Sequence, residues 1–107
     1  MKPDLSIIIV NFNTKQLLER CLQSIQSSII NHQSLIIELI VVDNGSTDGS
    51  KEMVNEQWLT GNVKLIENQQ NFGFAKAVNQ GLKQAKGEYL LLLNSDVIVK
   101  KNSLENL

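Results

Sequence analysis

The stretch Ile36-Ile37-Glu38-Leu39-Ile40-Val41-Val42 runs directly into the polar stretch Asp43-Asn44-Gly45-Ser46-Thr47-Asp48. Two further apolar runs end in the same way: residues 5–10 before Asn11-Phe12-Asn13, and residues 89–93 before Asn94-Ser95-Asp96. Runs rich in Ile, Val and Leu are typical of strands that are buried on both faces of a parallel sheet. Ligands of open α/β sheets bind just beyond the carboxyl ends of the strands. The sequence therefore predicts a ligand site lined by Asn and Asp.

Length and composition fit one small globular domain. The chain has 107 residues, of which 42% are hydrophobic and 20% charged, and its formal net charge is −1. No basic block is present, so we expect no nucleic-acid partner. The single Cys21 excludes an internal disulfide, and no Cys/His set has zinc spacing. No signal peptide and no apolar run of the ~20 residues that span a membrane is found, so we expect a cytoplasmic protein.

Strand and helix patterns alternate, which predicts βαβ units. The expected strands are residues 5–10, 36–42, 63–67 and 89–93, and the expected helices are residues 15–27, 50–58 and 74–86. Asp48 or Ser46 could cap the second helix, and Gly87 fits the left-handed position that ends the third. Right-handed crossovers favour a Rossmann-like, mostly parallel sheet of strand order 3-2-1-4 with flanking helices. The ends of the first and fourth strands then face each other across a crevice, with Asp43 one strand away.

Apolar stripes predict which faces of the helices are buried. On the first helix the stripe consists of Leu17, Leu18, Cys21, Leu22 and Ile25. On the third helix it consists of Phe74, Ala77, Val78, Gly81, Leu82 and Ala85. Residues 102–107 resemble the start of another helix, so we expect the 107 residues to be the N-terminal part of a longer protein.

The strand-end carboxylates carry the first candidate roles. Asp96 suits a hard divalent cation, because Mg²⁺ prefers one or two carboxylates together with substrate phosphates and water. The alternative is a turn Asp that caps the next element. Asp43 could accept the ring N–H of uracil or thymine, but its segment is dense in turn formers, and on this segment alone a turn is the favoured interpretation.

The other candidates are amides and one lysine. Asn11 and Asn13 could hydrogen-bond a base or ribose, although capping the first helix is the favoured role for one of them. The segment from Asn71 through Gly73 leads into the third helix, whose N-terminus could receive a phosphate. Lys76, one turn later, could approach that anion or lie solvated on the helix face. Several nucleotide and hydrolase motifs are absent: Gly-x-Gly-x-x-Gly, Gly-Lys-Ser/Thr and Gly-x-Ser-x-Gly.

Four segments together resemble the family 2 glycosyltransferases in order and spacing. They are SIIIVNFN at residues 6–13, VVDNGSTDGS at 41–50, NFGFAKAVN at 71–79 and GEYLLLLNSD at 87–96. The last is most similar to the rhamnosyltransferase-like branch that acts in bacterial surface polysaccharide assembly. The resemblance implies a GT-A fold, a UDP- or dTDP-sugar donor, a divalent cation (Mg²⁺ or Mn²⁺), and transfer with inversion to a glycan or lipid-linked acceptor.

The resemblance also implies roles for individual residues. Asp43 matches the base-binding Asp, and Asn11 and Asn13 lie in the segment that lines base and ribose. Asn94-Ser95-Asp96 matches the Asp-x-Asp motif, with Asp96 as its metal-binding last residue. Asn94 departs from the motif and removes one charge, so we expect weaker metal binding through its amide oxygen.

The resemblance places the catalytic base beyond Leu107, so we expect the donor half of a site that turns nothing over alone. Two alternatives stay open: a non-catalytic nucleotide-binding or interaction module, and a sugar nucleotidyltransferase. The apolar fourth strand predicts self-association of the 107-residue chain, as a dimer or larger. The full-length protein would act in the cytoplasm or at the inner face of the membrane.

Overall fold

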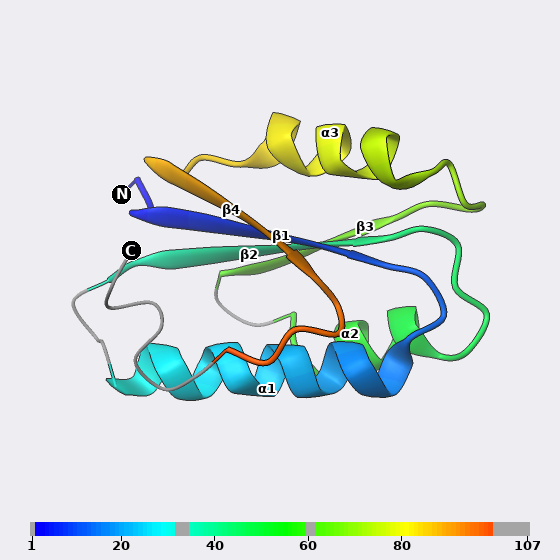
Figure 1. Ribbon diagram of the computed structural model, residues 1–107, viewed down its shortest axis with the longest axis horizontal. Helices are drawn as coiled ribbons and strands as arrows, with labels where there is room; N and C mark the ends of the chain where they lie inside the picture. The colour runs from blue at the N-terminus through cyan, green and yellow to red at the C-terminus, as the bar shows by residue number, and fades with distance from the viewer. Residues whose placement is uncertain (1, 32–34, 60–61, 100–107) are drawn as a thin grey trace.

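The computed structural model describes residues 2–31, 35–59 and 62–99. Four strands, β1 (Leu5–Asn11), β2 (Ile37–Asp43), β3 (Val63–Glu67) and β4 (Tyr89–Asn94), form one sheet in which every neighbouring pair is parallel. The strand order is β3-β2-β1-β4, which confirms the predicted order. Figure 1 shows three layers, with α3 (Phe74–Gln84) on one face of the sheet and α1 (Lys15–Asn31) and α2 (Ser50–Gln57) on the other. No helix among the described residues is long and apolar enough to cross a membrane.

The two central strands are buried on both faces, because helices cover both. Ile7, Ile9 and Val41 pack in the layer that α1 and α2 cover, whereas Ile8 and Ile40 pack against α3. The predicted stripe of α1 is confirmed at Leu18, Cys21, Leu22 and Ile25, all fully buried. The prediction for Leu17 is wrong, since this residue lies on the flank of the stripe and is 39% exposed. The helix also continues four residues beyond its predicted end, to Asn31.

Helix α3 sits close to the sheet because Gly81 has no side chain. A Cβ at Gly81 would lie 2.6 Å from Cγ2 of Ile8. Ala77 and Gly81 are buried as predicted, but the predictions for Phe74 and Leu82 are wrong: these residues are 52% and 41% exposed. The reason is that α3 packs on β1 and β2, so the flank of the helix that carries Phe74 and Leu82 is not covered.

The expected ends of α2 and α3 need correction. Neither Ser46 nor Asp48 is the N-cap of α2; that position is Gly49, with φ 91° and no side-chain cap bond. Asp48 still accepts the backbone N–H of Ser50 at 3.0 Å. Helix α3 ends at Gln84, and the left-handed conformation expected at Gly87 is not found, since the described positive-φ glycines are Gly45, Gly49 and Gly73.

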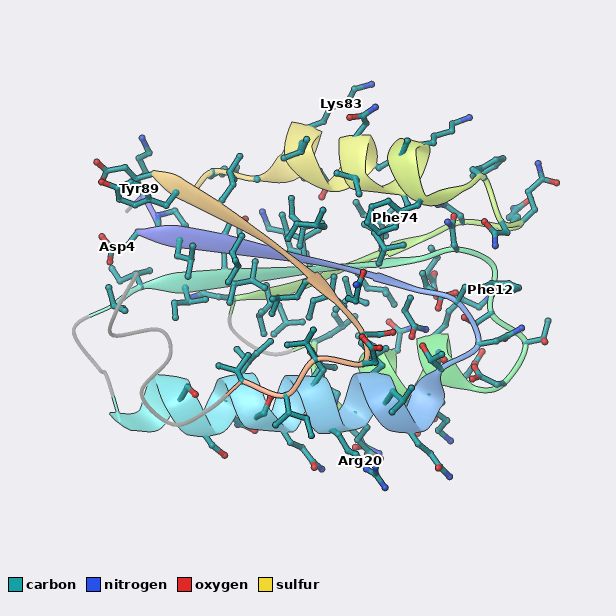
Figure 2. All side chains as sticks on the ribbon, viewed as in Figure 1. Asp4, Phe12, Arg20, Phe74, Lys83 and Tyr89 are labelled. Carbon is teal, nitrogen blue, oxygen red and sulfur yellow. The ribbon has the colours of Figure 1, made fainter. Side chains whose placement is uncertain are left out.

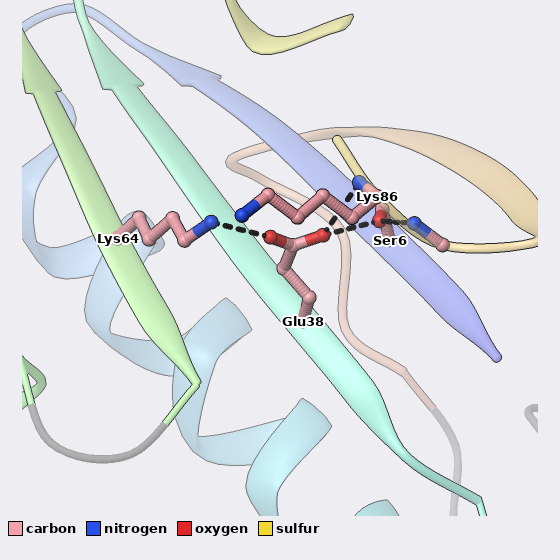
Figure 3. A network of polar contacts seen from close by, with 5 residues as sticks. Ser6, Glu38, Lys64 and Lys86 are labelled. Atoms are coloured by element: carbon pink, nitrogen blue, oxygen red, sulfur yellow. Dashed lines mark hydrogen bonds and ion pairs between the residues drawn. The ribbon is translucent and has the colours of Figure 1, made fainter. Parts of the chain in front are cut away.

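A buried glutamate connects the strands at the end of the sheet where they begin, opposite their carboxyl ends (Figure 3). Glu38 is 3% exposed, and its Oε1 accepts from Nζ of Lys64 at 2.8 Å. Its Oε2 accepts from Oγ of Ser6 at 2.6 Å and from the backbone N–H of Lys86 at 3.0 Å. Burial alone would raise the pKa of Glu38, but hydrogen bonds from Lys64, Ser6 and Lys86 outweigh it and lower this pKa. The residues of this network come from β1, β2, β3 and the connection into β4.

Candidate functional site

The carboxyl ends of β1, β2 and β4 lie side by side at one end of the sheet, which we call the carboxyl edge. Asn11 pairs with Asp43 in the register of β1 and β2, and Val10 pairs with Asn94 in that of β1 and β4. A cavity of about 360 Å³ opens at this edge and is lined by Val10, Phe12, Thr14, Leu17, Asn44, Asn71, Phe74, Asn94, Ser95 and Asp96. Figure 2 shows Phe12 and Phe74 toward this end, away from Asp4 and Tyr89. The cavity therefore brings together four predicted site residues: Asn71, Asn94, Ser95 and Asp96.

Asp43 and Asn11 lie beneath this edge and do not line the cavity. Asp43 is 1% exposed and Asn11 is fully buried. Oδ1 of Asp43 accepts from Nδ2 of Asn11 at 3.0 Å and from Oγ of Ser46 at 2.7 Å, and its Oδ2 accepts from the backbone N–H of Ser46 at 2.9 Å. Asp43 thus stabilises its own turn, as one of the two interpretations predicted. The role of Asp43 in binding a base stays a prediction.

Thr14 connects the end of β1 with the end of β4. Its Oγ1 donates to Oδ1 of Asn11 at 2.6 Å and lies 2.8 Å from Oγ of Ser95. Together with the bond between Asn11 and Asp43, these contacts form a continuous chain of four side chains across three strands. Sequence reasoning missed Thr14, although its place directly after the strand-end Asn-Phe-Asn is the signal that could have identified it.

Asn44 fixes the loop that carries Asn71. Its Nδ2 donates to the carbonyl of Gly73 at 3.1 Å, and its Oδ1 accepts from Nδ2 of Asn68 at 3.0 Å and from the N–H of Phe72 at 3.3 Å. Asn71 accepts the N–H of Gly73 at 2.8 Å, and Gly73 has a φ of 90° at the start of α3. One wall of the cavity is therefore held through a buried amide that sequence reasoning also missed.

Asn13 and Lys76 do not line this cavity. Asn13 has a φ of 52°, and its Oδ1 accepts the N–H of Thr47 at 2.7 Å. It borders a neighbouring hollow of about 520 Å³ together with Lys15 and Asp48. Lys76 is exposed, with Nζ 4.3 Å from the centroid of the Phe72 ring, a cation–π contact. Their roles toward a ligand stay predictions.

Neither Asn caps α1, because an aspartate from another loop does so. The first N–H of the helix, from Lys15, donates to Oδ2 of Asp48 at 2.9 Å. Asn11 and Asn13 direct their side-chain oxygens to Thr14 and Thr47 instead. Partial burial alone would raise the pKa of Asp48, but hydrogen bonds from Ser50 and Lys15 outweigh it and lower this pKa.

The turn after β4 offers oxygen donors that fit a hard divalent cation. Asp96, Asn94 and Ser95 line the same cavity, and their side chains carry a carboxylate, an amide oxygen and a hydroxyl; Asp96 is exposed. Within residues 2–31, 35–59 and 62–99, no group of three or more His, Cys, Asp or Glu could hold a metal. The described chain thus fits a cation that takes most of its ligands from phosphate and water, as Mg²⁺ does.

Cys21 is buried on α1, on the side of the helix that faces the turn with Asp96. Burial, and secondarily the negative charge of Asp96, raises the pKa of the Cys21 thiol to about 11. A thiol of such high pKa is a poor nucleophile at neutral pH. The interpretation of Cys21 as a core residue is confirmed by its full burial.

A parallel sheet with helices on both faces and a cavity where the strand order reverses defines the open α/β class of proteins, which bind their ligands at that point. The chain belongs to glycosyltransferase family 2: the model of that family, described as "Glycosyl transferase family 2", matches residues 6–107.

Similar proteins support this assignment. The chain is 36% identical over 104 residues to the glycosyltransferase GlyG of Streptococcus pneumoniae serotype 4, covering 96% of this chain and 33% of GlyG. It is 34% identical over 102 residues to a poly(ribitol-phosphate) beta-glucosyltransferase of Bacillus spizizenii, covering 94% of this chain and 16% of that protein. The chain thus spans about a third of the length of GlyG and less of the second relative.

Solved structures show the same fold with donors bound. S. aureus TarS 1–349 in complex with UDP-GlcNAc superposes with a TM-score of 0.83 at 30% identity, over 99% of this chain and 30% of the TarS 1–349 chain. The mannosyltransferase PcManGT of Pyrobaculum calidifontis, in complex with GDP-Man and Mn²⁺, gives a TM-score of 0.84 at 27% identity, over 99% of this chain and 31% of PcManGT. The predicted Rossmann-like GT-A fold is therefore confirmed.

Proposed function

We propose that the protein is an inverting glycosyltransferase that transfers a sugar from a nucleotide-diphospho-sugar to a glycan or lipid-linked acceptor. In this proposal the cavity between β1, β4 and the loop before α3 holds the donor. The observation that carries the proposal is the convergence of Asn71, Asn94, Ser95 and Asp96 on that cavity. Family membership and the nucleotide sugars bound by TarS and PcManGT support it.

The proposal gives each strand end a task. Asp43 and Asn11 would bind base and ribose, with Asn13 at the outer edge. Oδ1 of Asp43 already accepts two hydrogen bonds in the structure and Oδ2 accepts one, so the base would approach Oδ2, which has capacity for another.

The diphosphate would lie toward the β4 turn and α3. Asp96 and Asn94 would hold a Mg²⁺ or Mn²⁺ ion, which neutralises the leaving diphosphate when bound. Asn71 and Gly73 would place the N-terminus of α3 toward the phosphates, and Lys76 would add positive charge from the next turn.

Inversion requires a base that deprotonates the acceptor hydroxyl on the face opposite the leaving diphosphate. The proposal assigns this role to no described residue and places the base beyond Leu107. The 107-residue chain would therefore bind the donor and transfer no sugar. We place the full-length enzyme in the cytoplasm or at the inner face of the membrane, where nucleotide sugars would be available to it.

We also propose that the 107-residue chain associates with a second copy of itself through β4. This strand is at the edge of the sheet, and its side chains Leu90 and Leu92 are 53% and 44% exposed. An edge strand with an exposed apolar face favours pairing with another chain.

Titration calorimetry with UDP, dTDP and GDP, each with and without Mn²⁺, tests the donor proposal. We expect one nucleotide to bind more tightly with Mn²⁺, and Asp96→Ala to remove that gain. Glu88→Ala is the matched control, because it removes an exposed carboxylate at the opposite edge of the sheet. Metal-independent binding would favour the non-catalytic nucleotide-binding module, and binding of none of the three would contradict the donor site.

A further inference from the structure

The chain of hydrogen bonds from Asp43 to Ser95 has a defined direction. Oδ1 of Asp43 accepts from Oγ of Ser46 and from Nδ2 of Asn11, so Asn11 turns its NH₂ group toward Asp43. The carbonyl oxygen of the Asn11 side chain then points to Thr14, and the Thr14 hydroxyl donates its one proton to that oxygen. Reversing the Asn11 amide would place its oxygen against the Asp43 carboxylate.

The last contact of the chain is fixed by the same argument. Since the Thr14 hydroxyl already donates its one hydrogen bond to Asn11, Oγ1 of Thr14 can only accept from Ser95 across their 2.8 Å contact. The Ser95 hydroxyl thus donates its one proton to Thr14, its neighbour in the cavity lining, and not to a ligand. Its lone pairs remain available on the side where Asp96 and Asn94 line the cavity.

We infer that Thr14 is a positioning residue that makes Ser95 an acceptor toward the cation and diphosphate side of the cavity. This inference rests on the proposed function. A hydroxyl with free lone pairs can accept from cation-bound water or ligate a hard cation directly, whereas one that donates into the cavity would meet the positive side of such water. Thr14 acts through Ser95 and has no chemical step of its own.

The role of Thr14 also connects the two halves of the site. Asp43 anchors one end of the chain of hydrogen bonds, at the carboxyl end of β2, and Ser95 forms the other end, directly beside Asp96. The direction of every bond between them follows from the bond that Nδ2 of Asn11 donates to Oδ1 of Asp43. A group that orients a cation ligand in this way commonly changes metal affinity 10–100-fold, as a rough guide, when it is removed.

The test compares the metal gain, defined as the ratio of the nucleotide dissociation constants without and with Mn²⁺. It uses whichever of UDP, dTDP and GDP wild type binds most tightly. Thr14→Val keeps the side-chain shape without the hydroxyl, Thr14→Ser keeps the hydroxyl, and Ser95→Ala removes the acceptor. We expect Thr14→Val and Ser95→Ala each to lower the metal gain about tenfold. The double variant should lose no more than either single variant, because both act on one chain of bonds.

Thr14→Ser should keep the wild-type metal gain, which separates loss of the hydroxyl from a general disturbance of the turn. Thermal unfolding of each variant checks that it is folded at the temperature of titration. A wild-type metal gain in Thr14→Val, or additive losses in the double variant, would overturn the inference and leave the proposed function standing. Wild type without any metal gain would overturn the cation part of the proposed function and this inference with it.

Discussion

Asn11 and Asp43 are paired across β1 and β2, and Nδ2 of Asn11 donates to Oδ1 of Asp43 at 3.0 Å in a fully buried contact. Asp43 also accepts twice from Ser46, so both of its oxygens accept hydrogen bonds inside the fold. A residue that the resemblance assigns to base binding is therefore also part of the turn that shapes the site. Stability and binding must both respond when it changes.

Replacing Asp43 with Asn should destabilise the fold. The new NH₂ group must face either the NH₂ of Asn11 or the backbone N–H of Ser46, and one buried hydrogen bond is lost. We expect the free energy of unfolding to fall by about 1–3 kcal/mol, measured by urea denaturation. Glu88→Gln, an exposed change of the same type, should leave it unchanged. Equal stability of Asp43→Asn and wild type would show that the carboxylate does not hold the turn.

Glu38 predicts a defined pH dependence of stability. Its folded-state pKa is lowered from the ordinary value of 4.5. A lowered carboxyl pKa stabilises the fold at pH above the unfolded value, and that contribution is lost as pH falls through the folded value. The free energy of unfolding of wild type should therefore exceed that of Glu38→Gln most near neutral pH. This difference in free energy should shrink as pH falls below 4.5. Urea denaturation across this range measures it, and a difference that grows toward acid would contradict the assignment.

Gly45 and Gly73 form a matched pair for testing the close approach of two loops. Both have positive φ, 87° and 90°, but a Cβ at Gly45 would lie 2.8 Å from the backbone of Gln70, whereas one at Gly73 meets nothing within 4 Å. Backbone strain costs about 1–3 kcal/mol in either Ala variant. Gly45→Ala should be the less stable of the two in urea denaturation, because the collision adds to the strain. Equal losses would mean that the loop at Gln70 yields freely.

Cys21 should be unreactive in the folded protein. Its thiol is buried and has a pKa of about 11, so very little thiolate is present and reagents cannot reach it. At pH 8, a chromogenic disulfide reagent should label Cys21 only at the rate at which the protein unfolds, and immediately in urea. Rapid labelling without denaturant would show that the α1 face opens readily.

Self-association through β4 can be tested by one apolar-to-charged change. Leu92→Lys should shift the protein toward monomer in sedimentation velocity, because Leu92 is 44% exposed on the edge strand β4. Leu59→Lys is the control, since Leu59 is 41% exposed after α2, away from β4. A wild type that stays strictly monomeric at high concentration would rule the proposal out.

Periodicity in the sequence was sufficient to predict most of the fold. Parallel strands buried on both faces have continuous apolar runs, so β1 to β4 were placed to within a residue or two at each end. Errors arose where neighbours decide the outcome. Leu82 looks like a core residue by spacing, but α3 packs over β1 and β2 and leaves it exposed.

The candidate site was predicted less completely than the fold. Strand ends indicated Asn94 and Asp96, since the topology itself brings such residues together. Asn44 has no pattern in the sequence, and Thr14 is marked only by its place after Asn-Phe-Asn, because their partners Gly73 and Ser95 lie 29 and 81 positions away. The burial of Asp43 likewise depends on the fold of its own turn, which spacing does not reveal.

The central claim is that a cation and a nucleotide diphosphate bind at the β4 turn, and paramagnetic broadening by Mn²⁺ in NMR spectra tests it most directly. With Mn²⁺ and the nucleotide that binds, the amide signals of Ser95, Asp96 and Asn71 should broaden, while those of Lys64 and Tyr89 at the far edge should stay sharp. Asp96→Ala should abolish the broadening at the turn. Broadening that is uniform, or strongest at the Glu38 edge, would contradict the claim.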